Sequence, residues 1–444
     1  MKNSGVEWIG EIPEDWEVRK ILNCLRKRIS DGPHETPKYV ETGIPFISVD
    51  SLNDTEYVDF SFVNRFISDE DYFEYNKKTN LEENDILFSK AATIGKTAIV
   101  HADEKFMVWS PIAILKTNNS LDNRFLYFLL NYDGLITHIS YLGSINTQIN
   151  VGMRELEQAR IPLPPKETQQ HIASYLDKKC SKIEETIQNQ QRVIEKLKAY
   201  KQSLITEAVT GKVKIVNGKA CGEYESYKDF KLKWLGDFNI PEKWNRIQVK
   251  SFVSIPVVDG PHESPELFDN GIPYISATAI ENSKIDFSLK RGFISEKYCN
   301  ECDKRYKPMR DDKLMIKLGA TTGQVAIVET DERFNIWVPL AAIRCNKNIA
   351  LPKFVFYSFQ SDYCLKQMEM SWTFGTQQTL GVSSIERLKI FLPNIETQKE
   401  IAGYLDKKCT AIDTVIEQKQ KLIEKLTEYK KSLIYECVTG KKEI

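Results

Sequence analysis

The sequence has no excess of either charge and no long apolar run. It contains 61 lysine and arginine residues against 62 aspartate and glutamate residues, a formal net charge of −1. This is not the basic balance of a typical stand-alone DNA-binding domain, so a nucleic-acid role would depend on local patches or on a partner that adds charge. A run of about eighteen apolar residues occurs nowhere, and the start, MKNSGVEWIGEIPEDW, is charged where a signal peptide is apolar. We therefore expect a soluble, cytoplasmic protein.

Cysteine frameworks and catalytic motifs are also missing. The nine cysteines lie between Cys24 and Cys437 without a framework spacing, which suits free thiols in a reducing compartment. Cys299 and Cys302 form a lone C-x-x-C with no second pair, so we expect no metal site there. Neither a G-x-G-x-x-G after a strand nor a Ser-His-Asp arrangement shared by both halves occurs. No catalytic constellation emerges from these residues.

What the sequence does contain is a copy of itself. DGPHETP at 31–37 returns as DGPHESP at 259–265, and other matches follow in the same order at offsets of 226 to 229 residues. They include GIPFIS (43–48) with GIPYIS (271–276), and FMVWSPIAILK (106–116) with FNIWVPLAAIR (334–344). Each half is a variable part followed by a near-identical part. At 444 residues the chain is long enough for two or three domains, and two similar halves fit that length.

The near-identical parts, which open with ETQQHIASYLDKKC at 167–180 and ETQKEIAGYLDKKC at 396–409, have helical periodicity. Apolar residues recur at steps of three, four or seven, which predicts a coiled-coil-like seam. At ~1.5 Å per residue the helix over 172–208 would be about 55 Å long. Each helix is expected to stop at a V-T-G-K sequence, whose glycine is a candidate C-cap. The central seam residues are Ile183, Ile187, Ile194, Leu197 and Leu204 in the first copy and Ile412, Ile416, Ile423, Leu426 and Leu433 in the second.

A polar helix of this length must bury its seam against a partner. The obvious partner of each helix is its own copy, and the alternative is that each helix packs on its neighbouring globular domain. The variable parts read as compact α/β (α+β) domains, with strand-like runs at 44–52, 84–100 and 107–116 and a helical stretch at 123–139. The expected organisation is a globular domain at 1–160, a helical repeat at 161–212, a linker at 213–233, a second globular domain at 234–389 and a second helical repeat at 390–444.

The repeated D-G-P-H sequence allows three interpretations. Asp31, His34 and Glu35 could bind a metal or act in catalysis, but no second histidine or cysteine lies nearby in either copy to complete a zinc site. Asp-Gly-Pro is also an ordinary turn former. The third interpretation is a turn that presents His34 and His262 to a ligand.

KAATIGKT at 90–97 comes close to the phosphate-binding loop G-x-x-x-x-G-K-T. Lys90 stands where the first glycine belongs, and Gln324 replaces the essential lysine in the second copy, so ATP binding is not expected. A small Gly/Thr loop between strands is still suited to contacts with DNA phosphates or base edges, although a plain hairpin is equally compatible. The residues concerned are Lys90, Thr93 and Lys96 in the first copy and Lys317, Thr321, Thr322 and Gln324 in the second.

Two polar stretches, GSINTQIN at 143–150 and GTQQTLG at 375–381, differ between the copies while their flanks agree. Asn and Gln can pair bidentately with adenine in the major groove, and Ser or Thr can bond to bases or phosphates. A solvated loop is an equally ordinary interpretation. The candidate DNA-contacting residues are Ser144, Asn146, Thr147 and Gln148, and Thr376, Gln377, Gln378 and Thr379.

The motifs together point to a known family. Each near-identical part carries an E-T-Q sequence after proline-containing text, then I-A-x-Y-L-D-K-K, and ends in K-x-S-L-I-x-x-x-V-T-G-K. WIGEIPEDW at 8–16 and DGPHETP at 31–37 are similar to target-recognition text of the same family. In this order, and over essentially the whole chain, the set resembles the specificity (HsdS) subunit of type I restriction-modification enzymes.

The resemblance implies that each variable part is a target recognition domain reading one half of a split, asymmetric DNA sequence. The two helices would form an antiparallel coiled coil that spaces the domains and docks two methyltransferase subunits, with restriction (motor) subunits joining for restriction. The chain itself would be non-catalytic, and S-adenosylmethionine, ATP and Mg would be bound by the partners. Antiparallel packing of two copies of one helix gives an internal pseudo-twofold axis, which suits the local twofold symmetry of the duplex backbone.

Two other functions remain open from the residues alone. A single-chain DNA-modifying enzyme would be active without partners and would lose activity on replacement of Asp31 or His34. A coiled-coil interaction scaffold without DNA binding would be indifferent to the replacement of Lys90 and Lys317.

Overall fold

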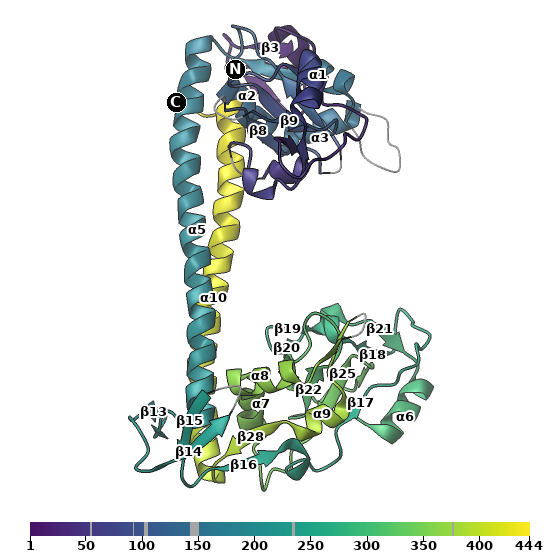
Figure 1. Cartoon of the computed structure of the whole chain (residues 1–444), viewed down its shortest axis with the longest axis vertical. Coiled ribbons are helices and arrows are strands. Elements are labelled where there is room, and N and C mark those ends of the chain that lie inside the picture. The colour runs from purple at the N-terminus through teal and green to yellow at the C-terminus, as the bar shows by residue number, and fades with distance from the viewer. Residues whose placement is uncertain (54–55, 92, 102–104, 143–150, 233–235, 375–376) are drawn as a thin grey trace. The chain divides into compact units, whose positions relative to one another are not determined.

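The computed structural model describes residues 1–444 except 54–55, 92, 102–104, 143–150, 233–235 and 375–376 (Figure 1). The chain divides into two compact units: the first joins Met1–Gln190 with Gln420–Ile444, and the second is Gln191–Lys419. Each unit contains one globular domain together with segments of both long helices. Within the described residues, no helix has the length and apolar character needed to cross a membrane.

The globular domain of the first unit is made of short strands, with one α-helix between β6 and β7 and three between β10 and β11. Its strands are β1 (Lys2–Asn3), β2 (Glu11–Ile12), β3 (Glu17–Lys20), β4 (Ser30–Asp31), β5 (Ile44–Ile47), β6 (Phe66–Ile67), β7 (Ile86–Ser89), β8 (Thr97–Ile99), β9 (Met107–Val108), β10 (Ile112–Leu115) and β11 (Arg160–Leu163). Its helices are α1 (Asp69–Thr79), α2 (Asn123–Leu130), α3 (Asp133–Leu142) and α4 (Met153–Gln158). The stretch 123–139, expected as one helix, is therefore two helices.

A four-stranded antiparallel sheet in the order β4-β10-β7-β8 forms the centre of this domain. Because side chains alternate along a strand, β7 supplies two separate cores: Phe88 packs in the core that contains α2, and Leu87 packs in the core that contains Ile47 of β5. A three-stranded sheet, β6-β5-β9, stands beside it, with β5 parallel to β9 and antiparallel to β6. Strand β3 pairs with β11, which leads into the long helix α5.

The globular domain of the second unit repeats this plan. Its strands are β12 (Ile215–Val216), β13 (Lys219–Ala220), β14 (Tyr227–Leu232), β15 (Gly236–Pro241), β16 (Asn245–Gln248), β17 (Val258–Asp259), β18 (Ile272–Ile275), β19 (Ile280–Glu281), β20 (Lys284–Ile285), β21 (Gly292–Ile294), β22 (Lys313–Ile316), β23 (Val325–Ile327), β24 (Asn335–Ile336), β25 (Leu340–Ile343), β26 (Thr373–Phe374), β27 (Gln378–Thr379) and β28 (Lys389–Leu392). Its helices are α6 (Glu296–Arg305), α7 (Pro352–Gln360), α8 (Asp362–Met370) and α9 (Val382–Arg387). The sheets β17-β25-β22-β23 and β21-β18-β24 correspond strand by strand to those of the first unit, so the repeat in sequence is a repeat in fold.

One repeated sequence explains how both domains start their first helix. In each F-I-S motif the phenylalanine and isoleucine lie in a strand and the serine is the N-cap of the next helix. Ser68 accepts a hydrogen bond from the backbone N–H of Asp71 at the start of α1, and Ser295 accepts one from Tyr298 at the start of α6. A serine at this position satisfies a backbone donor that the first helical turn leaves free.

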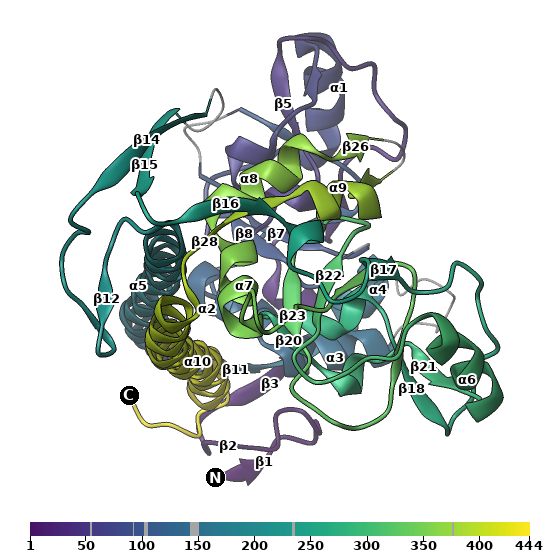
Figure 2. The ribbon, with the colours of Figure 1, turned by 90° about the horizontal axis from the view of Figure 1, so that it is seen from below.

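The two near-identical repeats are the long helices α5 (Lys166–Thr210) and α10 (Ile395–Val438). Figures 1 and 2 show them side by side. In the first unit Lys430 of α10 forms an ion pair with Glu184 of α5, and in the second unit Lys201 of α5 donates to Asp413 of α10 at 2.7 Å. In the first unit a residue from the first half of α5 pairs with one near the end of α10, and in the second unit a residue near the end of α5 pairs with one from the first half of α10. The coiled coil is therefore antiparallel. Asp413 is the repeat counterpart of Glu184, and Lys430 is the counterpart of Lys201, each at an offset of 229. The same contact therefore occurs once in each unit.

The C-terminal end of each long helix packs against the proline and tryptophan of a repeated I-P-x-x-W motif. Gly440, just after α10, has φ +70°, and a Cβ built on it would lie 2.4 Å from Pro13 Cδ. Gly211, just after α5, has φ +75°, and its Cβ would lie 2.4 Å from Pro241 Cδ. Both glycines are C-caps in the left-handed region, where a residue without a Cβ is favoured. The V-T-G-K and I-P-x-x-W motifs are therefore two sides of one contact.

Residues 213–233, expected to be a linker, contain regular structure. Strands β12 and β13 pair as a hairpin, and β14 pairs with β15 over six residue pairs. The backbone N–H of Gly218, in the turn of the first hairpin, donates to Glu400 of α10 at 3.0 Å. The segment therefore belongs to the second unit and contacts its long helices.

Candidate nucleic-acid interface

The D-G-P-H turn of the first unit is organised around a buried carboxylate. Asp31, at the end of β4, accepts hydrogen bonds from Lys78 Nζ at 2.8 Å and from Lys90 Nζ at 2.9 Å. His34 Nε2 lies 3.1 Å from Asp31 Oδ2, and the histidine side chain is 68% exposed. Burial alone would raise the pKa of Asp31, but the hydrogen bonds from Lys78 and Lys90 outweigh burial and hold the pKa below its ordinary value. The turn therefore has an ionised aspartate at its base and an exposed imidazole on its surface.

The second unit contains the same cluster. Asp259, at the end of β17, accepts hydrogen bonds from Arg305 Nη2 at 2.5 Å and from Lys317 Nζ at 2.7 Å. His262 Nε2 lies 3.3 Å from Asp259 Oδ2, and the histidine side chain is 69% exposed. Burial again opposes these contacts, and the hydrogen bond from Lys317 and the nearby charges hold the pKa of Asp259 below its ordinary value. The two clusters differ only in the exposed cation, which is Lys78 in one and Arg305 in the other.

The glycine of each turn is required by a close approach of two backbones. A Cβ on Gly32 would lie 1.8 Å from the carbonyl oxygen of Val108, and a Cβ on Gly260 would lie 2.4 Å from that of Ile336. The next residue in each case is a partly exposed tryptophan, Trp109 or Trp337. The D-G-P-H turn is thus pressed against the strand that precedes this tryptophan.

Lys90 and Lys317 occupy a different place from the one expected. The sequence predicts that they contact DNA, but their side chains are only 14% and 8% exposed, and each ammonium group is already paired with the buried Asp31 or Asp259. A cation in this position neutralises a buried carboxylate and holds the turn, because an unpaired buried charge is very costly. We therefore assign these two lysines a positioning role in place of the expected DNA contact.

The Gly/Thr loops predicted at 90–97 and 317–324 are hairpin turns, β7 to β8 and β22 to β23, and no helix follows them as it would in a phosphate-binding loop. Thr93 is exposed and Lys96 is half-buried. In the second unit Thr321 and Gln324 are exposed, whereas Thr322 is buried and its hydroxyl donates to the carbonyl oxygen of Gly319 at 2.7 Å. Thr322 therefore stabilises the turn, and the other four residues remain DNA-contact candidates.

The two polar stretches that differ between the copies are described to different extents. Ser144, Asn146, Thr147 and Gln148 lie outside the described residues, as does Thr376. In the second unit β26 and β27 form a hairpin, in which Gln377 is exposed and Gln378 and Thr379 are half-buried. This hairpin is joined to the β22–β23 turn, since Gly319 N–H donates to the carbonyl oxygen of Gln378 at 3.1 Å.

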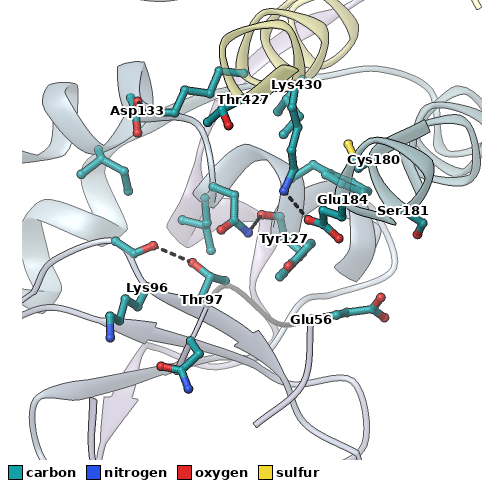
Figure 3. A pocket seen from close by; sticks show the side chains of 18 of the residues that line it. Glu56, Lys96, Thr97, Tyr127, Asp133, Cys180, Ser181, Glu184, Thr427 and Lys430 are labelled. Atoms are coloured by element: carbon teal, nitrogen blue, oxygen red, sulfur yellow. Dashed lines mark hydrogen bonds and ion pairs between the residues drawn. The ribbon is translucent and has the colours of Figure 1, made fainter. Parts of the chain in front are cut away.

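A cavity of about 830 Å³ lies in the first unit between the β7–β8 turn, α2 and both long helices (Figure 3). Its lining includes Lys96, Tyr127, Cys180 and the ion pair of Glu184 with Lys430, which Figure 3 shows on the side of the long helices. Burial raises the pKa of Cys180 to about 11. The thiol is therefore protonated at neutral pH and is not an activated nucleophile.

Among the described residues, no group of three or more His, Cys, Asp or Glu side chains is arranged to hold a metal ion. Cys299 and Cys302, the lone C-x-x-C, are buried in α6 as free thiols. Burial raises the pKa of both. These two cysteines belong to the packing of α6.

The predicted seam residues show nearly the same burial pattern in both helices. Ile183, Ile194, Ile412, Ile423 and Leu433 are buried, and Ile187, Leu197, Leu204, Ile416 and Leu426 are half-buried. The N-terminal part of α5 has a second role, because Ile172, Leu176 and Cys180 belong to the core of the globular domain together with the end of α10. Pairing with the copy and packing on a globular domain, the two alternatives for the seam, therefore occur together in one core, which also contains Ile183 and Leu433.

Sequence reasoning missed the cations and aromatic rings that surround the D-G-P-H turns. Lys78 and Arg305 occupy matching places at the ends of α1 and α6, which a longer alignment from the F-I-S motifs could have revealed. Stacking was not predictable from the repeat: the guanidinium carbon of Arg65 lies 5.9 Å from the centroid of the Trp109 ring, and that of Arg291 lies 3.3 Å from the Trp337 centroid. Both are cation–π contacts, and each tryptophan follows the strand beside a D-G-P-H turn.

The chain thus contains two copies of one α/β domain, with the same charged turn and a polar stretch that differs in sequence, together with two long helices that form an antiparallel coiled coil. The family model "Type I restriction modification DNA specificity domain" matches the chain twice, over residues 13–196 and 241–426. The chain belongs to this family, the non-catalytic, DNA-recognising component of type I restriction-modification systems. The expected family, fold class and absence of an enzymatic role are confirmed.

Relatives match along most of their length. A protein of Methanocaldococcus jannaschii named as the specificity subunit of the type I restriction enzyme MjaX is 28% identical to this chain. The match covers 98% of this chain and 95% of that protein. The specificity subunit of the type I restriction enzyme EcoKI from Escherichia coli is 20% identical over 97% of this chain and 90% of its own. A chain solved in work on the assembly and conformational transition of the type I R-M system has a TM-score of 0.67 at 14% identity, covering 97% of this chain and all of that one. That last similarity is one of fold.

Proposed function

We propose that the chain recognises a bipartite, asymmetric DNA target, with one half-site read by the domain of each unit. The supporting observation is a constant scaffold with variable loops. The central sheets and the D-G-P-H turns are the same in both domains, whereas the stretches 143–150 and 375–381 differ in sequence. Equal scaffolds with different loops are suited to reading two different base sequences in equivalent grooves.

Exposed apolar residues on the long helices support the docking of two copies of one partner. Tyr200 and Val193 of α5 are 56% and 36% exposed, and Tyr429 and Leu422 of α10 are 53% and 42% exposed. Each α10 residue is the copy of an α5 residue at an offset of 229. Exposed aromatic and aliphatic pairs of this kind are typical of protein contact sites. Because they occur twice, we assign them to two methyltransferase subunits, and to these and the restriction subunits we assign the chemistry with S-adenosylmethionine and ATP.

The helix pair would also set the distance between the half-sites. A four-residue insertion between 190 and 191, with a matching one between 419 and 420, adds about 6 Å to each helix. At ~3.4 Å per base pair, the preferred spacer should lengthen by about one or two base pairs. A motif with an unchanged spacer would refute this part of the proposal.

The decisive test is co-expression of the chain with a candidate methyltransferase subunit, followed by sequencing of methylated adenines across a genome. The proposal predicts one motif of two different half-sites separated by unspecified bases. Tyr200→Ala with Tyr429→Ala should abolish methylation and co-purification, while Lys196→Ala with Lys425→Ala, at exposed positions on the same helices, should leave both intact. Methylation of a continuous motif would contradict the bipartite target.

The alternatives make different predictions. An enzyme would act as the purified chain alone, but the Asp31 that it would use is fully buried and paired with lysine. A scaffold without DNA binding would leave methylation-site choice unchanged when the 375–381 stretch is replaced. No observation on the described residues favours either alternative.

A further inference from the structure

The clusters around Asp31 and Asp259 contain groups that the structure of the turn does not need. In each turn a buried aspartate is paired with a lysine that is at most 14% exposed, 2.9 Å away in the first unit and 2.7 Å away in the second. Each cluster adds a second cation at the surface, with Lys78 56% exposed and Arg305 53% exposed. It also adds a histidine ring that is more than two-thirds exposed.

The buried aspartate and the cations paired with it sum to a positive charge before any histidine is protonated. One carboxylate, Asp31, faces two permanent cations, Lys78 and Lys90. Asp259 likewise faces Arg305 and Lys317. The surplus is repeated at equivalent sites of a chain whose formal net charge is −1. A local surplus of positive charge with exposed donors is suited to an anion.

Both clusters are bonded to a described residue at or just after the end of a stretch that differs in sequence between the domains. The backbone N–H of Val151, the first described residue after 143–150, donates to the carbonyl oxygen of Lys90 at 2.9 Å. The backbone N–H of Leu380 donates to the carbonyl oxygen of Lys317 at 2.8 Å. The same lysine therefore holds the charged turn with its side chain and the end of the variable stretch with its carbonyl group. Val151 and Leu380 are therefore held next to the charged turns.

Each domain has a further cation, Arg65 or Arg291, immediately before β6 or β21. Arg65, an exposed residue, contacts the rings of both Tyr39 and Trp109, with its guanidinium carbon 5.4 Å from the Tyr39 centroid. Arg291 lies over Trp337 in the second unit. Stacking on an aromatic ring fixes a guanidinium group while leaving N–H donors on its edge, and guanidinium donors match the geometry of phosphate oxygens.

We propose that each cluster, with Lys78 and His34 in the first unit and Arg305 and His262 in the second, contacts DNA phosphate without reading sequence. The proposal rests on the bipartite recognition function above. A buried aspartate with an exposed cation and an exposed histidine occurs in both domains, whose variable stretches differ, so we assign the difference between the half-sites to the stretches and not to the clusters. Phosphate contacts set the position and orientation of a domain on the duplex, while base contacts provide specificity. The two clusters thus register both domains on the backbone so that the variable stretches reach the bases.

The test uses Lys78→Gln with Arg305→Gln in the complex with the methyltransferase subunits. Binding to a target duplex and a non-target duplex is measured across a range of salt concentrations. The variant should bind both duplexes more weakly by similar factors, and the slope of log K against log[salt] should fall in magnitude by about one per site, about two in all. The methylated motif should not change. A second variant, His34→Ala with His262→Ala, should weaken binding to both duplexes in the same proportion.

The matched control is Lys77→Gln with Lys304→Gln. These lysines lie one residue away on the same helices, are 71% and 69% exposed, and pair only with Glu74 and Glu301 of their own helix among the described contacts. The control removes the same number of charges, so it should leave the salt slope close to that of the parent. An equal fall in slope for the control would show that only overall charge matters and would overturn the proposal.

Other outcomes also decide the question. A changed motif in the cluster variants would mean that these residues read bases, and unchanged affinity and slope would mean that they serve the fold alone; either result overturns the proposal. Intact folding of each variant is checked by its urea unfolding midpoint, since Asp31 and Asp259 keep their buried lysine partners. If the parent complex itself yields no bipartite motif, the proposed function fails instead, and the two failures are therefore distinguishable.

Discussion

The contact between a helix end and the I-P-x-x-W motif can be tested with a single methyl group. Gly440→Ala places a Cβ at a backbone position with φ +70°, 2.4 Å from Pro13 Cδ and 3.1 Å from Trp16 Cη2. Gly5→Ala is the matched control in the same unit, because Gly5 also has φ +70° but no atom within 4 Å of its Cβ position. The two variants share the backbone strain and differ in the collision.

The expected magnitudes follow from these two terms. A non-glycine residue in the left-handed region costs about 1–2 kcal/mol, which both variants incur. Forcing a methyl group into a packed contact adds about 1–3 kcal/mol when neighbours are rigid, and both the proline ring and the tryptophan are. Gly440→Ala should therefore destabilise the first unit by about 1–3 kcal/mol more than Gly5→Ala does. For a unit of about 150–250 residues this corresponds to a melting temperature lower by about 2–4 °C per kcal/mol.

Hydrogen exchange as a function of urea, followed by mass spectrometry, resolves the two units and so avoids the assumption of a single transition. Protection should fall in peptides from the end of α10 and from residues 8–16, and more in Gly440→Ala than in Gly5→Ala. Equal losses of stability in the two variants would refute the contact. A gain in stability for Gly440→Ala would refute the left-handed C-cap as well.

Two further predictions concern ion pairs in the first unit. Lys430→Glu should lower the unfolding free energy of the first unit by about 0.5–1 kcal/mol, because Lys430 and Glu184 are partly exposed, at 28% and 44%. Adding Glu184→Lys should recover most of this loss in a double-mutant cycle measured by urea unfolding. No recovery would mean that the helices are not paired at this register. The depressed pKa of Asp31 in the folded state contributes stability that is present above about pH 4 and is lost as pH falls through the folded-state pKa. Asp31→Asn should therefore flatten the acid limb of stability against pH, and an unaltered acid limb would contradict the assigned ion pairs.

The repeat and the helices were predictable because their signals are periodic. Steps of three, four or seven residues between apolar positions predict the seam from Ile183 to Leu204, and the repeat of this pattern predicts the second helix. The internal offset then predicted which elements are equivalent. The antiparallel direction was not dictated by periodicity and came from the resemblance to a known family; the two ion pairs, Glu184 with Lys430 and Lys201 with Asp413, now support it.

The candidate site was less predictable because its contacts join residues far apart in sequence. Lys90 is 59 positions from Asp31. A loop rich in Gly and Thr contains no sequence signal that its lysine is only 14% exposed and is paired with an aspartate. The hairpin of β26 and β27 was missed because TFGTQQT lacks the alternation of a strand, although polar side chains fit a strand pair at the surface. Asp31, for which a turn was one of three interpretations, is the last residue of β4, and its lysine partners could not be predicted from the turn-forming residues that follow it.

The linker illustrates a third kind of limit. The stretch 213–233 is polar and without periodicity, which suggested an extended connection, yet it contains β12, β13 and β14. Two-residue strands such as Ile215–Val216 are too short to show alternation. Their pairing is decided by the turn at Asn217 and Gly218, both of which have positive φ, and by contact with the helix, as in the bond from Gly218 to Glu400.

The claim that each globular domain reads its own half-site is tested most directly by making the two domains identical. In such a chain residues 241–392 are replaced by a second copy of 13–163, and the product is co-expressed with the methyltransferase subunit for genome-wide mapping of methylated adenines. The account predicts a motif made of two identical half-sites in inverted orientation, each equal to one half of the parent motif. Retention of the parent motif, or a motif that shares neither half with it, would contradict the account.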